Sequence, residues 1–388
     1  MTTAGATPLQ AETLRHLADL VAFPSVSAVS NLDIIAHIEG LAAGFGGRCR
    51  RFADPDGQKA NLLVSIGPEV PGGVVLSGHT DVVPVDGQDW GGDPWTLRRQ
   101  GDRVIGRGAT DMKGYLACML AVAPQLARLP LKTPVHLAFS YDEEVGCTGV
   151  IPMARWVGAN LRPRLAVIGE PSAMELVTAH KGGCVGWCHV TGKPGHSSQP
   201  ERGVNAVMVA SELVAGIAAL YREVQQGPHF EGLDPPWSTL QVNRIMGGSA
   251  GNILAEHCKF FWEMRLIPGQ SDRDMLARLQ ALADRLEPAM KAVDPVCGIR
   301  FDVQAGVTPL APTGDAALEA ELLTLLGTSG THAVSYGTEA GIFAEHGTPA
   351  VIIGPGDITD AHQPDESLAI AQLDACTAFL LRLGQSLT

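Results

Sequence analysis

The chain has 388 residues, with 41 acidic and 28 basic side chains and a formal net charge of −13 at pH 7. Its length predicts two or three domains, and 45% hydrophobic with 18% charged residues is the composition of a globular protein with an ample core. The acidic balance argues against nucleic acid as a partner, because a phosphate backbone binds basic surfaces.

No segment of the sequence has the pattern of a membrane span or of a secretory signal. Its longest apolar stretches, 116–123 and 204–220, contain polar residues or are shorter than a membrane span. The first ten residues have neither a basic start nor an apolar core, so no secretory leader is expected. The eight cysteines are scattered without a C-x-x-C pair, as in proteins with reduced thiols. We therefore expect no membrane partner and a cytoplasmic location.

The first 180 residues alternate helical and strand-like segments. Apolar residues recur at helical spacing over 10–23 and 31–45, with Asn31 as a possible N-cap, and a third helix is expected at about 112–127. Strand-like runs are expected at 61–66, 74–78, 135–141 and 165–168. This order predicts an α/β fold with a mixed, largely parallel sheet covered by helices.

The pattern changes near residue 181. Strands are expected at 184–190, 238–245 and 259–267, and helices at 203–221 and 271–286, which together make a small α+β unit. From about residue 293 the alternation resumes, and an apolar strand is expected at 350–353. The sequence therefore predicts a catalytic domain formed by 1–180 and 293–388, interrupted by an inserted domain at 181–292.

Polar side chains follow several of the apolar runs in the first part of the chain. His79 and Asp81 close one run, Glu143 and Glu144 another, and Glu170 a third. Strands that repeatedly end in a carboxylate or imidazole indicate one polar site at one edge of a sheet. With two further candidates, the possible metal ligands are two histidines and three carboxylates, a donor set that suits two Zn²⁺ or similar ions: His79, Asp111, Glu144, Glu170 and His362.

Each of these residues also has an ordinary structural explanation. Asp111 could cap a helix, and the adjacent Glu143 and Glu144 could be two solvated loop residues. Two neighbouring carboxylates after an apolar run nevertheless repel each other unless one is protonated or a cation is present. Asp81 lies two residues after His79, so in a strand both would face the same side, and we expect its carboxylate to accept the second ring N–H of His79.

Seven short segments resemble the zinc-dependent M20 family of metallopeptidases and deacylases. They are residues 77–84, 106–114, 142–146, 169–171, 195–200, 336–341 and 361–366. The resemblance covers essentially the whole chain and implies an inserted domain that serves as a lid and in dimerisation. It also implies a non-proline cis peptide between Asp111 and Met112.

The same resemblance implies a role for each candidate. Asp111 would bridge two Zn²⁺ ions per subunit, for which Co²⁺ can substitute. His79 with Glu170 would complete one metal site, and Glu144 with His362 the other. Glu143 would be the general base and acid, and Asp81 would orient His79.

Substrate recognition is also implied by the resemblance. His196 of one subunit would reach the active site of its partner in a homodimer, and Asn252 and Arg265 would hold polar and carboxylate groups of the substrate. An ion pair of Arg265 with Glu263 is the structural alternative. The backbone at Gly337 and Thr338 would line a carboxylate pocket, with Glu339 in a first helical turn as the alternative.

These features predict a hydrolase that cleaves the amide of a small N-acyl amino acid. The resemblance at 337–341 implies N2-acetyl-L-ornithine as the substrate, which would give L-ornithine and acetate as in arginine biosynthesis. Other N-acyl-amino-acid deacylases and a succinyl-diaminopimelate desuccinylase remain alternatives. A non-catalytic metal-binding protein is disfavoured, because such a protein has no need of Glu143 beside its ligands.

Overall fold

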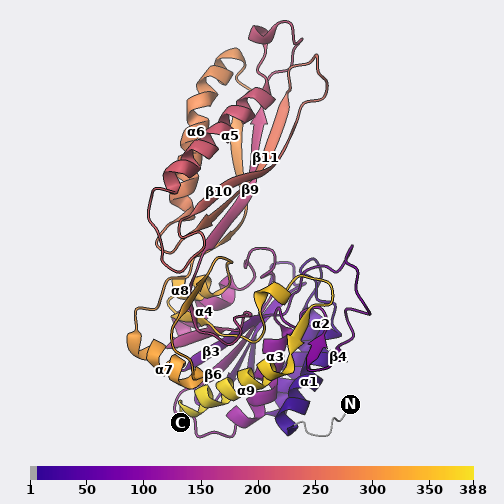
Figure 1. Ribbon diagram of the computed structural model, residues 1–388, viewed down its shortest axis with the longest axis vertical. Helices are drawn as coiled ribbons and strands as arrows, with labels where there is room; N and C mark the ends of the chain where they lie inside the picture. The colour runs from indigo at the N-terminus through magenta and orange to yellow at the C-terminus, as the bar shows by residue number, and fades with distance from the viewer. Residues whose placement is uncertain (1–6) are drawn as a thin grey trace. The chain divides into compact units, whose positions relative to one another are not determined.

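The computed structural model describes residues 7–388, so the expectation of no leader at the N-terminus lies partly outside the described residues. The fold divides into two compact units (Figure 1). Unit 1 comprises the chain up to Ala179 together with Leu310–Ala333 and Thr338–Thr388. Unit 2 comprises His180–Pro309 and Val334–Gly337.

An eight-stranded mixed sheet forms the centre of unit 1, in the order β1-β2-β6-β3-β7-β14-β8-β13. The central strands β6, β3, β7 and β14 are parallel to their neighbours in this group, whereas β1, β2 and β8 pair antiparallel. The predicted mixed, largely parallel sheet is confirmed. The strands are β1 (Arg48–Ala53), β2 (Ala60–Ile66), β3 (Val74–His79), β6 (Val135–Ser140), β7 (Leu165–Ile168), β8 (Val177–His180), β13 (His332–Val334) and β14 (Ala350–Ile352).

Helices cover this sheet. They are α1 (Pro8–Val21), α2 (Leu32–Gly44), α3 (Lys113–Leu126), α4 (Ile151–Asn160), α7 (Ala316–Leu326), α8 (Ala340–Glu345) and α9 (Ile370–Gln385). Helix α3 packs on β3 and β6 and lies between α1 and α9. The three helices predicted in this part of the chain are present. Asn31 precedes α2 but does not cap it; its side-chain amide instead exchanges two hydrogen bonds with the backbone of Ala60 in β2.

A second, small sheet in unit 1 joins distant parts of the chain. It has the order β15-β5-β4, with β4 (Arg98–Gln100), β5 (Arg103–Ile105) and β15 (Ser367–Ala369). The short 3-10 helix η2 (Ile358–Asp360) precedes β15. The pairing of β15 with β5 brings the loop that contains His362 to the loop that leads into Asp111.

Unit 2 is a four-stranded antiparallel sheet with two helices. The sheet order is β10-β11-β9-β12. The strands are β9 (Gly182–Thr191), β10 (Thr239–Gly247), β11 (His257–Leu266) and β12 (Gly298–Val307), the helices are α5 (Ala206–Val224) and α6 (Asp272–Val293), and a 3-10 turn η1 spans Pro200–Arg202. Helices α5 and α6 lie along this sheet (Figure 1). Alternate residues of β11, among them Phe260, Trp262 and Met264, are buried in a core shared with the two helices.

The inserted unit ends later along the chain than the sequence predicted. Residues 298–307, which form β12, were expected in the catalytic domain, which was to resume at residue 293. It pairs with β9 from Gly298 opposite Thr191 to Val307 opposite Gly183, so unit 2 continues to Pro309. The boundary at 292 was therefore wrong. Ile299, Phe301, Val303, Ala305 and Val307 alternate with polar residues or glycine, which is the pattern of a strand. That pattern does not show which of the two sheets the strand joins.

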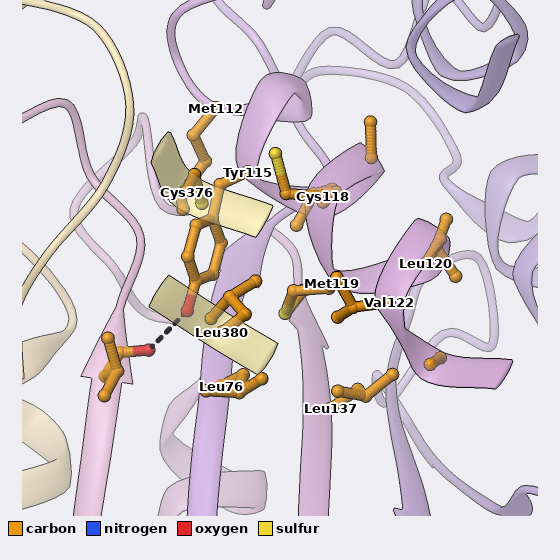
Figure 2. Packing of buried hydrophobic residues seen from close by; sticks show 14 of the residues in the cluster. Leu76, Met112, Tyr115, Cys118, Met119, Leu120, Val122, Leu137, Cys376 and Leu380 are labelled. Carbon is orange, nitrogen blue, oxygen red and sulfur yellow. Dashed lines mark hydrogen bonds between the residues drawn. The ribbon is translucent and has the colours of Figure 1, made fainter. Parts of the chain in front are cut away.

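The main core of unit 1 connects α3 to the sheet beneath the strand ends. Tyr115 and Met119 of α3 lie over Leu76 of β3, with Leu380 of α9 beside them (Figure 2). The Tyr115 hydroxyl donates to the main-chain oxygen of Val167 in β7 at 3.3 Å. A Cβ atom on Gly169, just after β7, would lie 2.0 Å from the Tyr115 ring. Only glycine therefore fits at the position that precedes Glu170.

Over residues 7–388, no helix has the length and apolar character that a membrane crossing requires.

We predict that Gly169→Ala destabilises the protein. The fully buried Tyr115 ring has no space to move, so the added methyl group should lower the free energy of unfolding by about 1–3 kcal/mol, the usual cost of overpacking. Gly40→Ala is the control, because Gly40 is exposed in α2 and a Cβ there would meet no atom within 4 Å. That change should stabilise by about 0.4–1 kcal/mol in the same denaturant titration. Equal effects of the two substitutions would contradict this account of the core.

Candidate active site

Three neighbouring parallel strands of unit 1 end at one edge of the sheet with polar residues. β3 ends at His79, β6 is followed by Glu143 and Glu144, and β7 is followed by Glu170. Because β6, β3 and β7 are adjacent and parallel, their carboxyl ends meet at the same edge, where α/β sheets form their sites. The single polar edge expected from the sequence is present.

The five predicted metal ligands form two groups that share Asp111. In the first, His79 Nε2 lies 3.0 Å from Asp111 Oδ1 and 3.6 Å from Glu170 Oε1. In the second, His362 Nε2 lies 3.1 Å from Asp111 Oδ2 and 3.1 Å from Glu144 Oε2. One ligand atom from each residue of a group lies within 4.8 Å of the others, a spacing that could hold a metal ion. The peptide between Asp111 and Met112 is cis, as expected.

The charges of this cluster are unbalanced without a cation. Burial and the nearby Asp111 raise the pKa of Glu144, and the same two effects raise the pKa of Glu170 well above its usual value. Hydrogen bonds to Asp111 and Glu144 raise the pKa of His362 to about 10. Buried Glu170 Oε1 has no hydrogen-bond partner among the described residues. Oxygen and nitrogen donors without a thiolate, and an unpartnered carboxylate oxygen, fit divalent metal ions.

Asp81 differs from its sequence prediction in the atom that contacts His79. The main-chain oxygen of Asp81 lies 2.8 Å from His79 Nδ1, whereas its carboxylate is 3.6 Å away. The prediction of a carboxylate contact was wrong because β3 ends at His79, so the two-residue period of a strand does not extend to Asp81. The carboxylate instead accepts the Ser27 hydroxyl at 2.7 Å and the N–H groups of Glu143 and Glu144 at 3.3 Å each. Asp81 thus holds the turn that carries both glutamates.

Glu143 lies beside the two ligand groups but belongs to neither. Burial raises the pKa of this carboxyl well above its usual range, and the Cys147 thiol donates a hydrogen bond to its Oε1 at 3.2 Å. Cys147 was not singled out in the sequence, since an isolated cysteine gives no signal there. A half-buried carboxyl outside the ligand set can accept and release a proton.

Three further buried charged residues were not assigned a role from sequence. Glu339 is 1% exposed at the N-cap of α8, and burial raises its pKa to about 7. Arg107 and Glu366 form an ion pair of 2.8 Å in which both side chains are 1% exposed. All three lie in segments that carry the family resemblance, but their burial and pairing depend on contacts between residues far apart in the sequence.

The predicted substrate residues divide between the two units. Thr338, in unit 1, is fully buried, and its hydroxyl accepts the N–H of Ala340, the first residue of α8. Gly337, in unit 2, lies in a tight space, since a Cβ there would be 3.0 Å from Val307 and 3.2 Å from the oxygen of Lys181.

His196 and Asn252 are neighbours at one end of the unit 2 sheet. Both are exposed, and a backbone bridge joins His196 to Ile253, the residue after Asn252. The main-chain oxygen of Asn252 accepts the N–H of Ser197 at 3.1 Å. His196 Nδ1 lies 2.7 Å from the Ser198 hydroxyl, which leaves the other ring nitrogen free to meet a ligand.

Arg265 lies at the opposite end of β11. Its Nε donates to Glu263 at 2.7 Å, and the other oxygen of Glu263 accepts from Asn243 at 3.0 Å, so the ion pair considered from sequence is present. The Arg265 side chain is 43% exposed and lines a pocket of about 290 Å³. The other charged residues of this pocket are Lys181, Asp234 and Glu263.

Comparison with known proteins places this geometry in a family. Residues 75–386 match the model described as peptidase family M20/M25/M40. An acetylornithine deacetylase of Myxococcus xanthus is 36% identical over 94% of this chain and 95% of its own length.

Two solved structures share the fold. An M20 metallo-carboxypeptidase of Sulfolobus solfataricus superimposes with a TM-score of 0.75 at 18% identity, covering 96% of this chain and 98% of its own. A dinuclear metal-binding M20 peptidase of Bacillus subtilis has a TM-score of 0.64 at 15% identity, covering 98% of both chains. Most of the chain matches the family model, and the curated relative is similar along nearly its whole length. The chain therefore belongs to peptidase family M20/M25/M40 and is a metal-dependent amidohydrolase.

Proposed function

We propose that this protein hydrolyses the amide of an N-acyl amino acid, with N2-acetyl-L-ornithine as substrate and L-ornithine and acetate as products. The observation that carries the proposal is the pair of ligand groups sharing Asp111, with Glu143 beside them and outside both. The substrate follows from curated relatives named acetylornithine deacetylase that match more than 90% of this chain. All eight cysteines are free thiols, which suits a reducing cytoplasm.

The metal sites are proposed to hold two Zn²⁺ ions, with Co²⁺ as a substitute. His79, Asp111 and Glu170 would hold one ion, and Asp111, Glu144 and His362 the other. A bound divalent ion polarises an amide carbonyl and lowers the pKa of water. The raised pKa values of Glu144 and Glu170 support this assignment, because a cation would relieve the repulsion between these buried carboxylates.

Glu143 is proposed to move the proton of the reaction. Its carboxylate would take a proton from the attacking water and pass it to the nitrogen of the leaving amine. The carboxylate of Asp81 would keep Glu143 in place by accepting its backbone N–H. The backbone contact of Asp81 with His79 would fix the tautomer of that ring, so that Nε2 faces Asp111.

The pocket around Arg265 suits a substrate that carries both charges. A guanidinium group can bind the α-carboxylate, and the carboxylates of Asp234 and Glu263 can bind a side-chain ammonium. N2-acetyl-L-ornithine has one group of each kind. This complementarity supports the choice of a cationic side chain over an apolar one.

A homodimer is proposed because the substrate residues of one unit 2 lie too far apart. His196 and Asn252 lie beyond the start of β11, and Arg265 is near its end. Ten residues of strand span about 30 Å, which a substrate of this size cannot bridge. We therefore propose that His196 is supplied to each active site by the partner subunit. The unpaired edge strand β10 and the exposed Met208, Ile245 and Ile253 offer surface for the contact.

Amide hydrolysis by the purified protein tests the proposed function. The substrates are acetylornithine, succinyl-diaminopimelate, acetylmethionine and a dipeptide, each with and without a chelator. We expect kcat/KM for acetylornithine to exceed the others at least tenfold, about 1.4 kcal/mol of discrimination. Activity should disappear with the chelator and return with Zn²⁺ or Co²⁺. Preference for another substrate would refute the assigned substrate, and activity insensitive to chelator would refute the metal dependence.

Two substitutions should separate proton transfer from metal binding. Glu143→Gln keeps the shape of the side chain but removes the base, so kcat should fall by about 10²–10⁴-fold while two ions remain bound. Asp111→Ala removes a donor from both groups and should lower metal content and activity together. Metal content measured on the purified variants distinguishes the two roles. Loss of metal from Glu143→Gln would contradict the role of Glu143 in proton transfer.

Mixing two inactive variants tests the shared active site. In a heterodimer of His196→Ala and Glu143→Gln, one active site would carry both defects and the other none. Random exchange of subunits in a two-fold dimer should therefore restore about a quarter of wild-type activity. A monomeric mass by light scattering, or no recovery after mixing, would contradict the proposed dimer.

A further inference from the structure

The side chain of His362 is more exposed than those of the two residues that would share its metal ion. The His362 side chain is 51% exposed, whereas those of Asp111 and Glu144 are 6% and 7% exposed. The backbone of His362 has a φ of 62°, in the left-handed region that is unfavourable for this residue. Its position therefore depends on contacts made by the rest of its loop.

Glu366, four residues further along, anchors this loop to the backbone around Asp111. Its Oε1 accepts the N–H groups of Thr110 and Asp111 at 2.8 and 2.9 Å. Its Oε2 accepts the N–H of Gly108 at 3.0 Å and the guanidinium of Arg107 at 2.8 Å. One buried carboxylate thus receives four hydrogen bonds from the segment that leads into Asp111.

Arg107 and Gln88 extend this contact to His362 itself. The second terminal nitrogen of Arg107 donates to the side-chain oxygen of Gln88, and the amide nitrogen of Gln88 donates to the main-chain oxygen of His362 at 2.8 Å. Arg107 also donates to the main-chain oxygen of Gln363 at 3.4 Å. A continuous chain of hydrogen bonds therefore runs from the N–H of Asp111 through Glu366, Arg107 and Gln88 to His362.

We propose that Glu366, acting through Arg107 and Gln88, is a positioning residue that sets His362 relative to Asp111 and so sets the affinity of the metal site formed by Asp111, Glu144 and His362. The inference rests on the proposed function, since it presumes that this group binds an ion. The group of His79, Asp111 and Glu170 has its own support, because the main chain of Asp81 orients His79 directly. Loss of the Glu366 contacts should therefore weaken binding of the ion at Asp111, Glu144 and His362 more than binding of the ion at His79, Asp111 and Glu170.

Glu366→Gln tests the carboxylate with almost no change in shape. Each oxygen of Glu366 faces two donors, so the amide nitrogen of glutamine would oppose donors in either orientation of the side chain. Gln88→Glu interrupts the series of hydrogen bonds at another point, between residue 88 and His362. It keeps an acceptor for Arg107 and places a carboxylate oxygen against the carbonyl of His362. Gln88 is only half-buried, so this variant should fold even if the first does not.

The control substitution is Asp360→Asn. Asp360 lies in the same loop and pairs with Arg103 at 2.6 Å, but both side chains are 38% exposed and neither contacts the backbone of His362 or Asp111. An exposed ion pair of this kind contributes little to stability, so its loss should leave metal affinity unchanged. His362→Ala serves as a reference that identifies which of two binding events depends on His362.

The measurement is a Zn²⁺ titration of each metal-free protein against a competing chelator, with thermal unfolding of the same samples. Glu366→Gln and Gln88→Glu should weaken the His362-dependent event by about 10–100-fold and leave the other within about threefold. An unchanged His362-dependent Kd in Gln88→Glu, or equal weakening of both events, would overturn the proposal. If the wild-type protein itself binds fewer than two ions, the proposed function fails instead.

Discussion

Repulsion among carboxylates at one edge of the unit 1 sheet is the constraint on which this protein's chemistry depends. The carboxyl ends of adjacent parallel strands lie at the same edge of the sheet, so the residues that follow them are close together whatever their charge. Here that convergence places Asp111, Glu144 and Glu170 in a buried space with only two imidazoles to balance them. Such an arrangement is stable only with cations or bound protons. The proposed divalent metal ions would balance this concentration of negative charge.

Most of the fold, and the candidate ligands that follow the strands, could be predicted because both depend on local patterns. Apolar runs marked the strands of unit 1, and a polar residue just after a run marked the sheet edge. The division of the five candidate ligands into two groups required the family resemblance, since no local pattern relates residue 362 to residue 111. Strand β12 was assigned to the wrong domain because its alternating pattern marks a strand but does not show which sheet the strand joins. The contact of Asp81 was misassigned because a strand's period does not continue past its last residue.

The residues that hold the site are the ones sequence reasoning could least identify. Glu366 accepts four hydrogen bonds from a segment more than 250 residues away in sequence, and the Asp81 carboxylate accepts two from the turn of Glu143 and Glu144. Both act as buried acceptors of backbone N–H groups, which fix loops where regular secondary structure does not. The candidate metal ligands on loops are thus held in place by hydrogen bonds, whereas His79 is held by strand β3. The proton transfer proposed for Glu143 would depend on the same support.

The shared position of Asp111 is the central claim, and diffraction at the zinc absorption edge tests it most directly. Crystals of the zinc-loaded protein should show two anomalous peaks about 3.5–4 Å apart, one facing each oxygen of Asp111. One peak should lie against His79 and Glu170, and the other against Glu144 and His362. A single peak, or two peaks of which only one contacts Asp111, would contradict the account.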